Sequence, residues 1–379
     1  MIIKSFKQKP DKLLLAISGI LIVLGIIFLI TVSTPYSLNK FNEPFYFFKH
    51  QLFYGLTFGL IFIFIIYKMD FKLIKKLGFY FFILSLFFVF LTVIPGLRDS
   101  WWGASRWINL GLFSFQPTEF LKVFFILYFA SWLSERQKTK SWGDKKQLKE
   151  IFLPFLLLMG ALSVLLYLQP DIGTLGVIIL TGLSMYFISG TPKYQTILLI
   201  ALGFIFLFSI IQVGYRSDRI AVLFNPDLDP MGIGYQMKQM RIAVGSGGLL
   251  GIEGDLSLGL SRQKFGFVPN PTSDSIFAIY AEEMGFVGCL FLIGLYLVFI
   301  FKGFLISKNL SKEDKFLSLA AFGITFWIGI QSFINIGAIS GILPLTGIPL
   351  VFISYGSSSL LSSFIGLGIL IKASSMIKS

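Results

Sequence analysis

A succession of long apolar runs separated by short polar segments constrains this chain more than any other feature. The runs cover residues 13–33, 48–67, 77–96, 117–134, 151–168, 173–190, 194–213, 276–301, 315–335 and 350–371. An α-helix needs about 20 apolar residues to cross the hydrocarbon core of a bilayer. The pattern predicts an all-α polytopic membrane protein with about ten transmembrane helices, formed as a single membrane domain over residues 1–379.

The composition agrees with a membrane protein and argues against one that binds nucleic acid. Apolar residues make up 55% of the chain and charged residues 13%, which leaves too little polar surface for a soluble domain. The net charge of +13 would suggest a nucleic-acid partner in a soluble protein, but here the Lys and Arg residues concentrate in alternate short loops. Such a bias sets the orientation of a protein in the membrane.

The positive charges predict which side of the membrane each loop faces. With the N-terminus inside, the basic segments around residues 4–12, 68–76, 135–150 and 302–315 all lie in the cytoplasm. Both termini are then cytoplasmic. Residues 214–275 form a large extracytoplasmic loop between the seventh and eighth spans. No small-residue cleavage site follows the first span, so we expect it to be retained.

Residues 261–285 join a polar loop to a long apolar segment, and Asp274 lies at the junction. Pro269 and Pro271 cannot continue a helix, so they stiffen the approach to it. Asp274 then has two interpretations. It is either the N-cap of the following helix or a catalytic carboxylate at the membrane surface, and the local sequence does not decide between them.

Four other charged residues lie near the predicted membrane edge. Glu119 and Lys122 fall on one helical face, where they form either an ion pair that fixes helix register or part of a functional site. Asp171 precedes an apolar helix, so it is either an N-cap or the partner of a basic residue. Arg106 has a planar guanidinium that suits two-point binding of phosphate or carboxylate.

The long loop has apolar and aromatic content typical of an ordered structure rather than a linker. Its segment Gly245–Gly248 could cradle a phosphate, but no strand precedes it, so flexible backbone is the preferred interpretation. In the following span we expect Glu282 or Glu283 to pair with an Arg or Lys across the bundle, because an unpaired carboxylate there is costly.

The chain has one cysteine, Cys289, and one histidine, His50. Neither an internal disulfide nor a Cys/His metal site can therefore be built. The sequence shows no dedicated metal cage, and it leaves open whether a divalent cation such as Mg²⁺ or Mn²⁺ assists the protein.

Eight motifs, in this order, resemble the SEDS family (shape, elongation, division and sporulation), whose members include FtsW, RodA and SpoVE. They are Pro44–Gln51, Ser105–Gly111, Phe115–Glu119, Leu168–Thr174, Asp229–Gln236, Gly245–Gly248, Asp274–Ala278 with Ala281–Gly285, and Leu343–Pro349 with Ile353–Gly356. Together they cover most of the chain. The segments 44–47 and 260–265 look more like the division branch than the elongation branch.

The resemblance implies a GT-C-like fold and a peptidoglycan glycosyltransferase that polymerises lipid II, the undecaprenyl-pyrophosphate-linked disaccharide pentapeptide. It also implies that Asp274 is the essential carboxylate, and we expect it to act as the general base. The expected substrate-binding residues are Arg106, Glu119, Lys122, Asp171, Arg216, Arg219, Gln236, Arg241, Arg262, Lys264 and Ser354. The basic ones among them are candidates to hold the pyrophosphate.

The expected partners are lipid II and the growing glycan strand, membrane lipid, a class B penicillin-binding protein with transpeptidase activity, and other proteins of a division or elongation complex. The expected location is the bacterial cytoplasmic (inner) membrane. Two alternatives are a lipid II flippase or transporter and a non-catalytic scaffold for the transpeptidase. A transporter is expected to keep its working charges near the bilayer midplane, whereas the key residues here gather at the rim.

The sequence departs from the family pattern around the key acid. The family's usual Pro-Glu-X-His-Thr-Asp is here the segment Pro269–Asp274, which reads Pro-Asn-Pro-Thr-Ser-Asp. The neighbouring acid and the histidine are missing, so a mechanism that uses either as a base or metal ligand does not transfer to this chain. Two further departures place Ser275 and Ser357 where the family usually has Phe and Gly.

Overall fold

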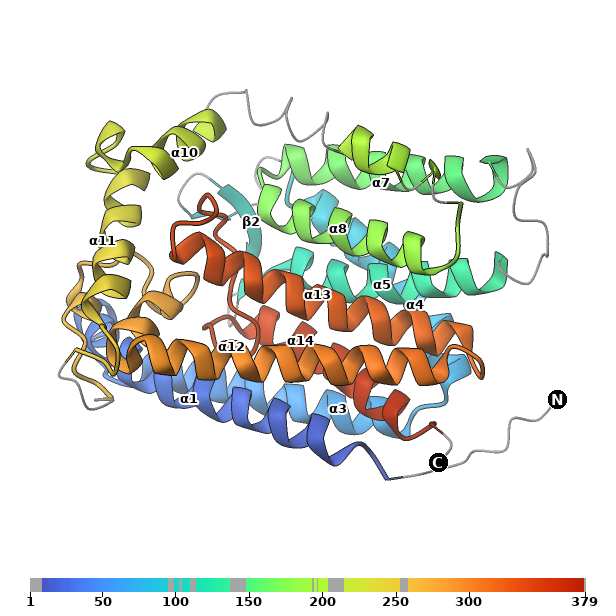
Figure 1. The fold of residues 1–379 in the computed structure, drawn as a ribbon, viewed down its shortest axis with the longest axis horizontal. Coiled ribbons are helices and arrows are strands. Elements are labelled where there is room, and N and C mark those ends of the chain that lie inside the picture. Colours follow the sequence, from blue (N-terminus) through green and yellow to red (C-terminus); the bar gives the residue numbers. More distant parts are fainter. Residues whose placement is uncertain are drawn as a thin grey trace.

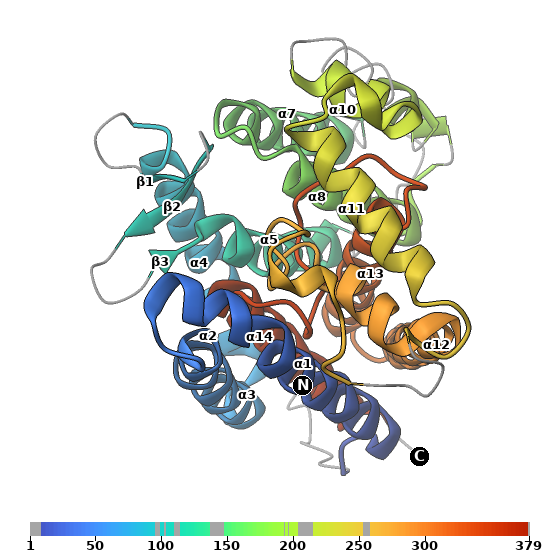
Figure 2. The ribbon, with the colours of Figure 1, turned by 90° about the vertical axis from the view of Figure 1, so that its left-hand side faces the viewer.

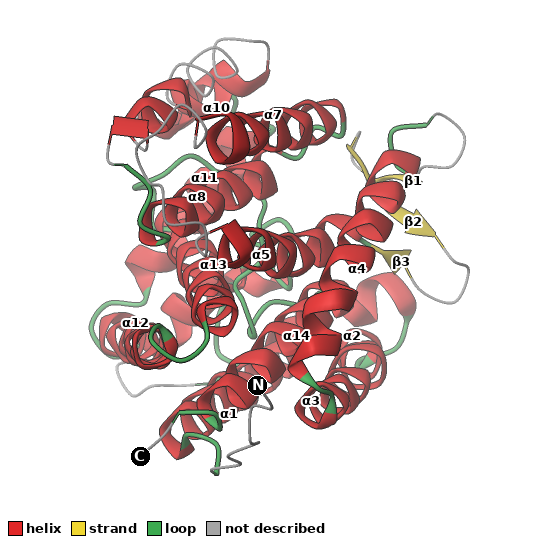
Figure 3. Ribbon diagram, turned by 90° about the vertical axis from the view of Figure 1, so that its right-hand side faces the viewer, coloured by secondary structure: helices red, strands yellow, loops and turns green. Residues whose placement is uncertain are grey.

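The computed structural model describes residues 9–94, 99–101, 104–109, 114–136, 148–192, 194–195, 197–203, 215–252 and 258–377. Long helices run side by side in one bundle, and a layer of shorter elements crosses one end of it (Figure 1). Figure 2 views the bundle from this end, where α11 lies across the helix ends, and Figure 3 views it from the opposite end.

The elements follow one another along the chain as follows. The first half contains α1 (Lys12–Phe41), α2 (Tyr46–His50), the π-helical η1 (Gln51–Thr57), α3 (Phe58–Lys68), α4 (Phe71–Leu91), β1 (Asp99–Trp101), β2 (Ala104–Asn109), β3 (Ser114–Phe115), α5 (Pro117–Arg136), η2 (Leu148–Phe152), α7 (Leu153–Leu168) and α8 (Ile172–Ile188). The second half contains α10 (Tyr215–Phe224), η3 (Pro226–Leu228), α11 (Ile233–Ser246), η4 (Gln263–Phe265), α12 (Ile276–Leu310), α13 (Lys315–Ile339) and α14 (Ser357–Ser374).

Seven helices of the described chain are long and apolar enough to cross a membrane, so this is a multi-pass membrane protein. They are Lys12–Phe41, Tyr46–Lys68, Phe71–Leu91, Leu148–Leu168, Ile276–Leu310, Lys315–Ile339 and Ser357–Ser374. The predicted spans 117–134 and 173–190 correspond to α5 and to the shorter α8. The predicted span 194–213 lies largely outside the described residues, so the total of about ten stays a prediction.

The strictly all-α prediction misses a small antiparallel sheet in which β2 lies between β1 and β3. Asp99 pairs with Trp107, and Ile108 pairs with Phe115. The segment Ala104–Asn109 contains Trp and Ile, which favour strands, and it is too short for a span. The sheet matters because β2 carries Arg106.

Helix α13 lies in the interior of the bundle, in contact with α5, α8, α12 and α14. Most residues of α13 and α14 are buried, whereas α3 and α4 expose many large apolar side chains at the periphery. Gly25 allows α1 to approach the segment before α14, since a Cβ at Gly25 would lie 2.3 Å from the Phe352 carbonyl oxygen. The core is therefore built around the helices that also carry the polar residues described below.

The start of α1 and the end of α14 meet at one end of the bundle. The backbone amide of Asp11 donates to Ser374 Oγ at 3.1 Å, and Lys302 Nζ lies 3.2 Å from Asp11 Oδ2. Asp11 also caps α1, because Oδ1 accepts hydrogen bonds from the amides of Leu13 and Leu14. The segment that carries Asp274 begins α12 at the other end.

Candidate functional site

Asp274 lies two residues before α12, and its side chain is partly buried. Its Oδ1 accepts a hydrogen bond from Ser273 Oγ at 3.1 Å, and its backbone oxygen accepts one from Asn335 Nδ2 at 2.8 Å. Ser275 occupies the N-cap position of α12, and no side-chain capping bond is found there within the described chain. The geometry therefore does not favour the capping interpretation of Asp274.

Two arginines from distant elements lie near Asp274. Burial raises the pKa of the Asp274 carboxyl above its ordinary value of 3.8, while the charges of Arg219 on α10 and Arg106 on β2 act in the opposite direction. Burial is the larger influence. The fold thus combines a carboxylate with a raised proton affinity and two cations, which is a suitable arrangement for proton transfer next to developing negative charge.

Other groups hold both arginines in place. Arg219 Nη1 donates to the backbone oxygen of Leu345 at 2.7 Å. Arg106 donates to the backbone oxygen of Pro170, and its Nη1 lies 3.7 Å from Asp171 Oδ1. The segments around residues 170 and 345 therefore support the cations that lie near Asp274.

Asp171 fits both of its sequence-based interpretations. Its Oδ1 accepts a hydrogen bond from the Thr174 amide at 3.3 Å, which caps α8. The same carboxylate faces Arg106 and accepts a hydrogen bond from Thr118 Oγ1 at 3.4 Å. Asp171 therefore positions Arg106, while the start of α8 compensates part of its charge.

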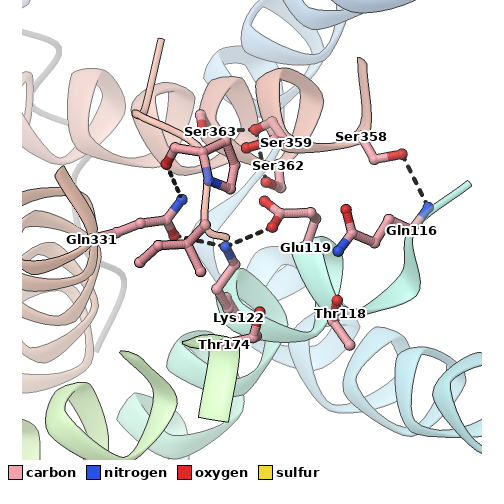
Figure 4. Close-up of polar contacts among 12 residues, drawn as sticks. Gln116, Thr118, Glu119, Lys122, Thr174, Gln331, Ser358, Ser359, Ser362 and Ser363 are labelled. Carbon is pink, nitrogen blue, oxygen red and sulfur yellow. Dashed lines mark hydrogen bonds and ion pairs between the residues drawn. The ribbon is translucent and has the colours of Figure 1, made fainter. Parts of the chain in front are cut away.

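Glu119 and Lys122 form an ion pair inside the bundle (Figure 4). Lys122 Nζ also donates to Gln331 Oε1 of α13 at 2.7 Å, and Gln331 Nε2 donates to the Pro349 backbone oxygen at 3.0 Å. The pair thus connects α5 to α13 and to the irregular segment that precedes α14. The predicted pairing is present, and the contacts described support a role in helix register.

Among the remaining candidates, Gln236 binds the residue that follows Asp274, and the others described here hold loops together. Arg241 Nη2 donates to the Leu223 backbone oxygen at 2.6 Å, and Gln236 Nε2 donates to Ser275 Oγ at 3.4 Å. Ser354 Oγ accepts a hydrogen bond from the Leu350 amide. Arg262 is exposed, and Arg216 lies in α10 but its side chain is outside the described residues.

Glu282 and Glu283 organise the loop that leads to Asp274. Glu283 lies 3.3 Å from Lys264 Nζ and accepts hydrogen bonds from the Gly259 and Ser261 amides. Glu282 accepts hydrogen bonds from Ser261 Oγ and from the amides of residues 262 and 263. The predicted pairing of one carboxylate with a basic residue is therefore present, but Lys264 comes from this loop and not from across the bundle.

In the segment Gly245–Gly248, the backbone of Gly247 and Gly248 packs directly against α12. A Cβ at Gly247 would lie 2.1 Å from the Ala281 oxygen. The amide of Phe286 donates to the Gly248 oxygen at 2.9 Å, beside Gly285, whose φ of 61° interrupts the helical geometry of α12. These glycines allow two backbones to meet without intervening side chains.

Sequence reasoning missed Gln331 and Asn335. Both are buried on α13, one helical turn apart, and both donate to backbone oxygens of the segment before α14. Two amides four residues apart on an otherwise apolar helix are the signal that could have identified them. Within the described residues no three His, Cys, Asp or Glu side chains gather to hold a metal ion, so we assign no metal ligands.

The chain is similar to known proteins over nearly its whole length. A family model described as "Cell cycle protein" (FtsW/RodA/SpoVE) matches residues 11–379. Stage V sporulation protein E of Bacillus subtilis is 36% identical over 97% of this chain and 98% of its own length. Probable peptidoglycan glycosyltransferase FtsW of Coxiella burnetii is 36% identical over 93% of this chain and 92% of its own.

Solved structures share the fold. A chain from a peptidoglycan synthase complex has a TM-score of 0.76 at 24% identity and covers 96% of this chain and 97% of its own. Thermus thermophilus rod shape determining protein RodA has a TM-score of 0.68 at 24% identity, with 98% of both chains covered. The chain belongs to the FtsW/RodA/SpoVE family of cell cycle proteins, the SEDS family that its motifs resemble.

Proposed function

We propose that this protein is a peptidoglycan glycosyltransferase that joins the saccharides of lipid II into glycan strands. The observation that carries the proposal is the gathering of Asp274 with Arg106 and Arg219, from three separate parts of the chain, at one end of the bundle. Relatives at 31–36% identity over nearly the whole chain are named probable peptidoglycan glycosyltransferase FtsW. The chemistry of this site suits that activity.

In the proposed reaction, the 4-hydroxyl of one lipid-linked sugar attacks the anomeric carbon of another. Asp274 accepts the hydroxyl proton as general base, while a new carbon–oxygen bond forms. The bond from the anomeric carbon to the pyrophosphate breaks, and its electron pair leaves with the lipid pyrophosphate. Arg106 and Arg219 stabilise the negative charge that develops on the leaving group.

The proposed location follows from the charges at the two ends of the bundle. The end where Asp11 meets Ser374 carries Lys9 and Lys12 and the basic segments of residues 68–76 and 302–315. We place this end, with both chain termini, in the cytoplasm, and Asp274 on the outer face of the bacterial cytoplasmic membrane. The loop 214–275 is then extracytoplasmic, where lipid-linked sugars and a class B penicillin-binding protein can meet it.

The transpeptidase partnership is part of the proposal. The chain from a peptidoglycan synthase complex, which coordinates polymerization and crosslinking, shares the fold of this protein. A polymerase of this fold produces a strand that a single-span class B transpeptidase can crosslink. A divalent cation such as Mg²⁺ is a further proposed assistant at the pyrophosphate, and the mechanism above is written only with the protein's own residues.

The test uses purified protein, with and without its transpeptidase partner, incubated with labelled lipid II and analysed for glycan ladders. The wild type is expected to form ladders and Asp274→Ala none. Asp227→Ala is the matched control, because Asp227 is an exposed acid of the same loop paired with Lys238. Ladders from Asp274→Ala would overturn its role. No ladder from the wild type, with lipid II crossing vesicle membranes, would favour a transporter.

A further inference from the structure

Asn335 joins two segments that are distant in sequence. It lies near the C-terminal end of α13 and is 2% exposed. Its Nδ2 group donates to the backbone oxygens of Asp274 and Ile348, each at 2.8 Å. One segment carries the proposed base and the other is the irregular stretch before α14, so a single amide group fixes one relative to the other.

The second segment also supports Arg219, one of the two cations near Asp274. Leu345, three residues before Ile348, accepts the hydrogen bond from Arg219. Between them, Gly347 lies near the carboxylate, since a Cβ added there would be 3.9 Å from Asp274 Oδ2. Residues 345–348 therefore form one short platform that binds Arg219 and lies near Asp274, and Asn335 attaches this platform to α13.

The orientation of the Asn335 amide follows from its partners. Two carbonyl oxygens face the same atom, so that atom must be the nitrogen, because an oxygen there would repel both. Its own Oδ1 is buried and has no hydrogen-bond partner among the described residues. An acceptor left unpaired in the protein interior is unfavourable. The presence of Asn335 here therefore indicates that the two hydrogen bonds donated by Nδ2 outweigh the cost of burying Oδ1.

We propose that Asn335 is a positioning residue for glycan polymerisation, and that it fixes the placement of Asp274 relative to Arg219. This inference rests on the proposed function. Asn335 does not need to touch the substrate, because it acts through the backbone of Asp274 and of the 345–348 platform. Loss of either donated bond lets the platform, with the Arg219 contact, move away from the carboxylate.

Asn335→Leu tests the proposal, because leucine has a similar volume and no polar atoms. In purified full-length protein with labelled lipid II, we expect kcat to fall about ten- to hundredfold while KM changes less than about twofold. The acid limb of the kcat profile should move to higher pH. The groups facing Asp274 are Ser273, Arg106 and Arg219. If Arg219 moves away, it stabilises the ionised carboxylate less, so the pKa of Asp274 rises.

Thr325→Val is the matched control. Thr325 is buried on the same helix and donates only to the Ala321 backbone oxygen, so the substitution removes a buried hydrogen bond without touching the site. It should keep the wild-type kcat and acid limb. Asn335→Ser is a second test variant. The serine side chain is too short to reach both carbonyl oxygens, so this variant should show the same kcat loss and pH shift.

Each result has one meaning. Wild-type kcat in Asn335→Leu would overturn the inference, as would a loss of kcat that matches the loss of folded protein and leaves the acid limb in place. Failure of both Asn335 variants to fold would also overturn it, since the amide would then be a general structural requirement. Absence of glycan from the wild type would instead reject the proposed function itself.

Discussion

Lys122 Nζ lies 2.9 Å from Glu119 Oε1 in the interior of the bundle, where each side chain is only 1% exposed. The residues are three apart on α5, so they share one helical face. Glu119 Oε2 is buried without a hydrogen-bond partner in the described chain, near serines of α14 (Figure 4). The ion pair is therefore enclosed by three helices, and both charges depend on each other for compensation.

Lys122→Met is expected to destabilise the protein strongly. The substitution leaves the Glu119 carboxylate buried without its cation, which typically costs about 3–5 kcal/mol. It also removes the hydrogen bond to Gln331 that joins α5 to α13. Thermal unfolding in detergent should show a clear drop in melting temperature, together with a lower yield of monodisperse protein.

The double variant Glu119→Gln/Lys122→Met is the control for charge. It removes both ionised groups, so it should recover much of the stability that the single variant loses. If the double variant melts no higher than Lys122→Met, lost packing is the cause and the account of an uncompensated charge is wrong.

The sequence predicted this pair because three-residue spacing on an apolar helix leaves few other partners. It also predicted most of the bundle, since α1, α4, α7, α12 and α13 coincide with long apolar runs. The strand that carries Arg106 was missed because six residues offer little periodic signal, and its pairing with β1 and β3 is a tertiary contact.

The choice among the basic candidates could not be read from the sequence. Arg219, Arg241 and Lys264 all belong to the same loop and look equivalent there. The fold separates them, since Arg219 lies near Asp274, Arg241 binds the end of α10, and Lys264 pairs with Glu283. Such assignments depend on contacts between distant segments, which local patterns do not contain.

Asp274→Asn should abolish polymerisation without lowering stability at neutral pH. Burial raises the pKa of Asp274 in the folded protein above its ordinary 3.8. The folded state then binds the proton more tightly than the unfolded chain, so this contribution to stability is present below the ordinary pKa and is lost as pH rises through the folded-state pKa. Asparagine does not ionise, so the variant avoids that loss.

Melting curves at pH 7 and at acidic pH check this prediction. The variant should melt at the same temperature as the wild type or higher at pH 7, and the difference should shrink as the pH falls. A variant that melts several degrees lower at pH 7 would mean that the ionised carboxylate stabilises the fold, contrary to this account.

Arg219→Gln should slow polymerisation and shift its pH dependence. The substitution removes a charge that lowers the pKa of Asp274, so the acid limb should move to higher pH. The loss of one charge-stabilising group typically reduces kcat about 10²–10³-fold. Arg241→Gln is the comparison, because Arg241 binds the Leu223 oxygen instead. An equal shift of the acid limb in both variants would argue against a specific role for Arg219.

Gly247→Ala and Gly245→Ala compare the same substitution at two positions near the end of α11. Gly247 has an ordinary φ of −66°, so alanine fits its backbone, but the new Cβ would lie 2.1 Å from the Ala281 oxygen and force α11 away from α12. We expect Gly247→Ala to lower the free energy of unfolding by about 1–3 kcal/mol. Its activity should also fall, because Glu282 and Glu283 of α12 hold the loop that leads to Asp274.

Gly245→Ala is the control. At Gly245 nothing lies within 4 Å of the added atom, so alanine should be neutral or stabilise the helix by up to about 1 kcal/mol. Melting temperatures and glycan yields measured side by side would contradict the close-packing account if the two variants behaved alike.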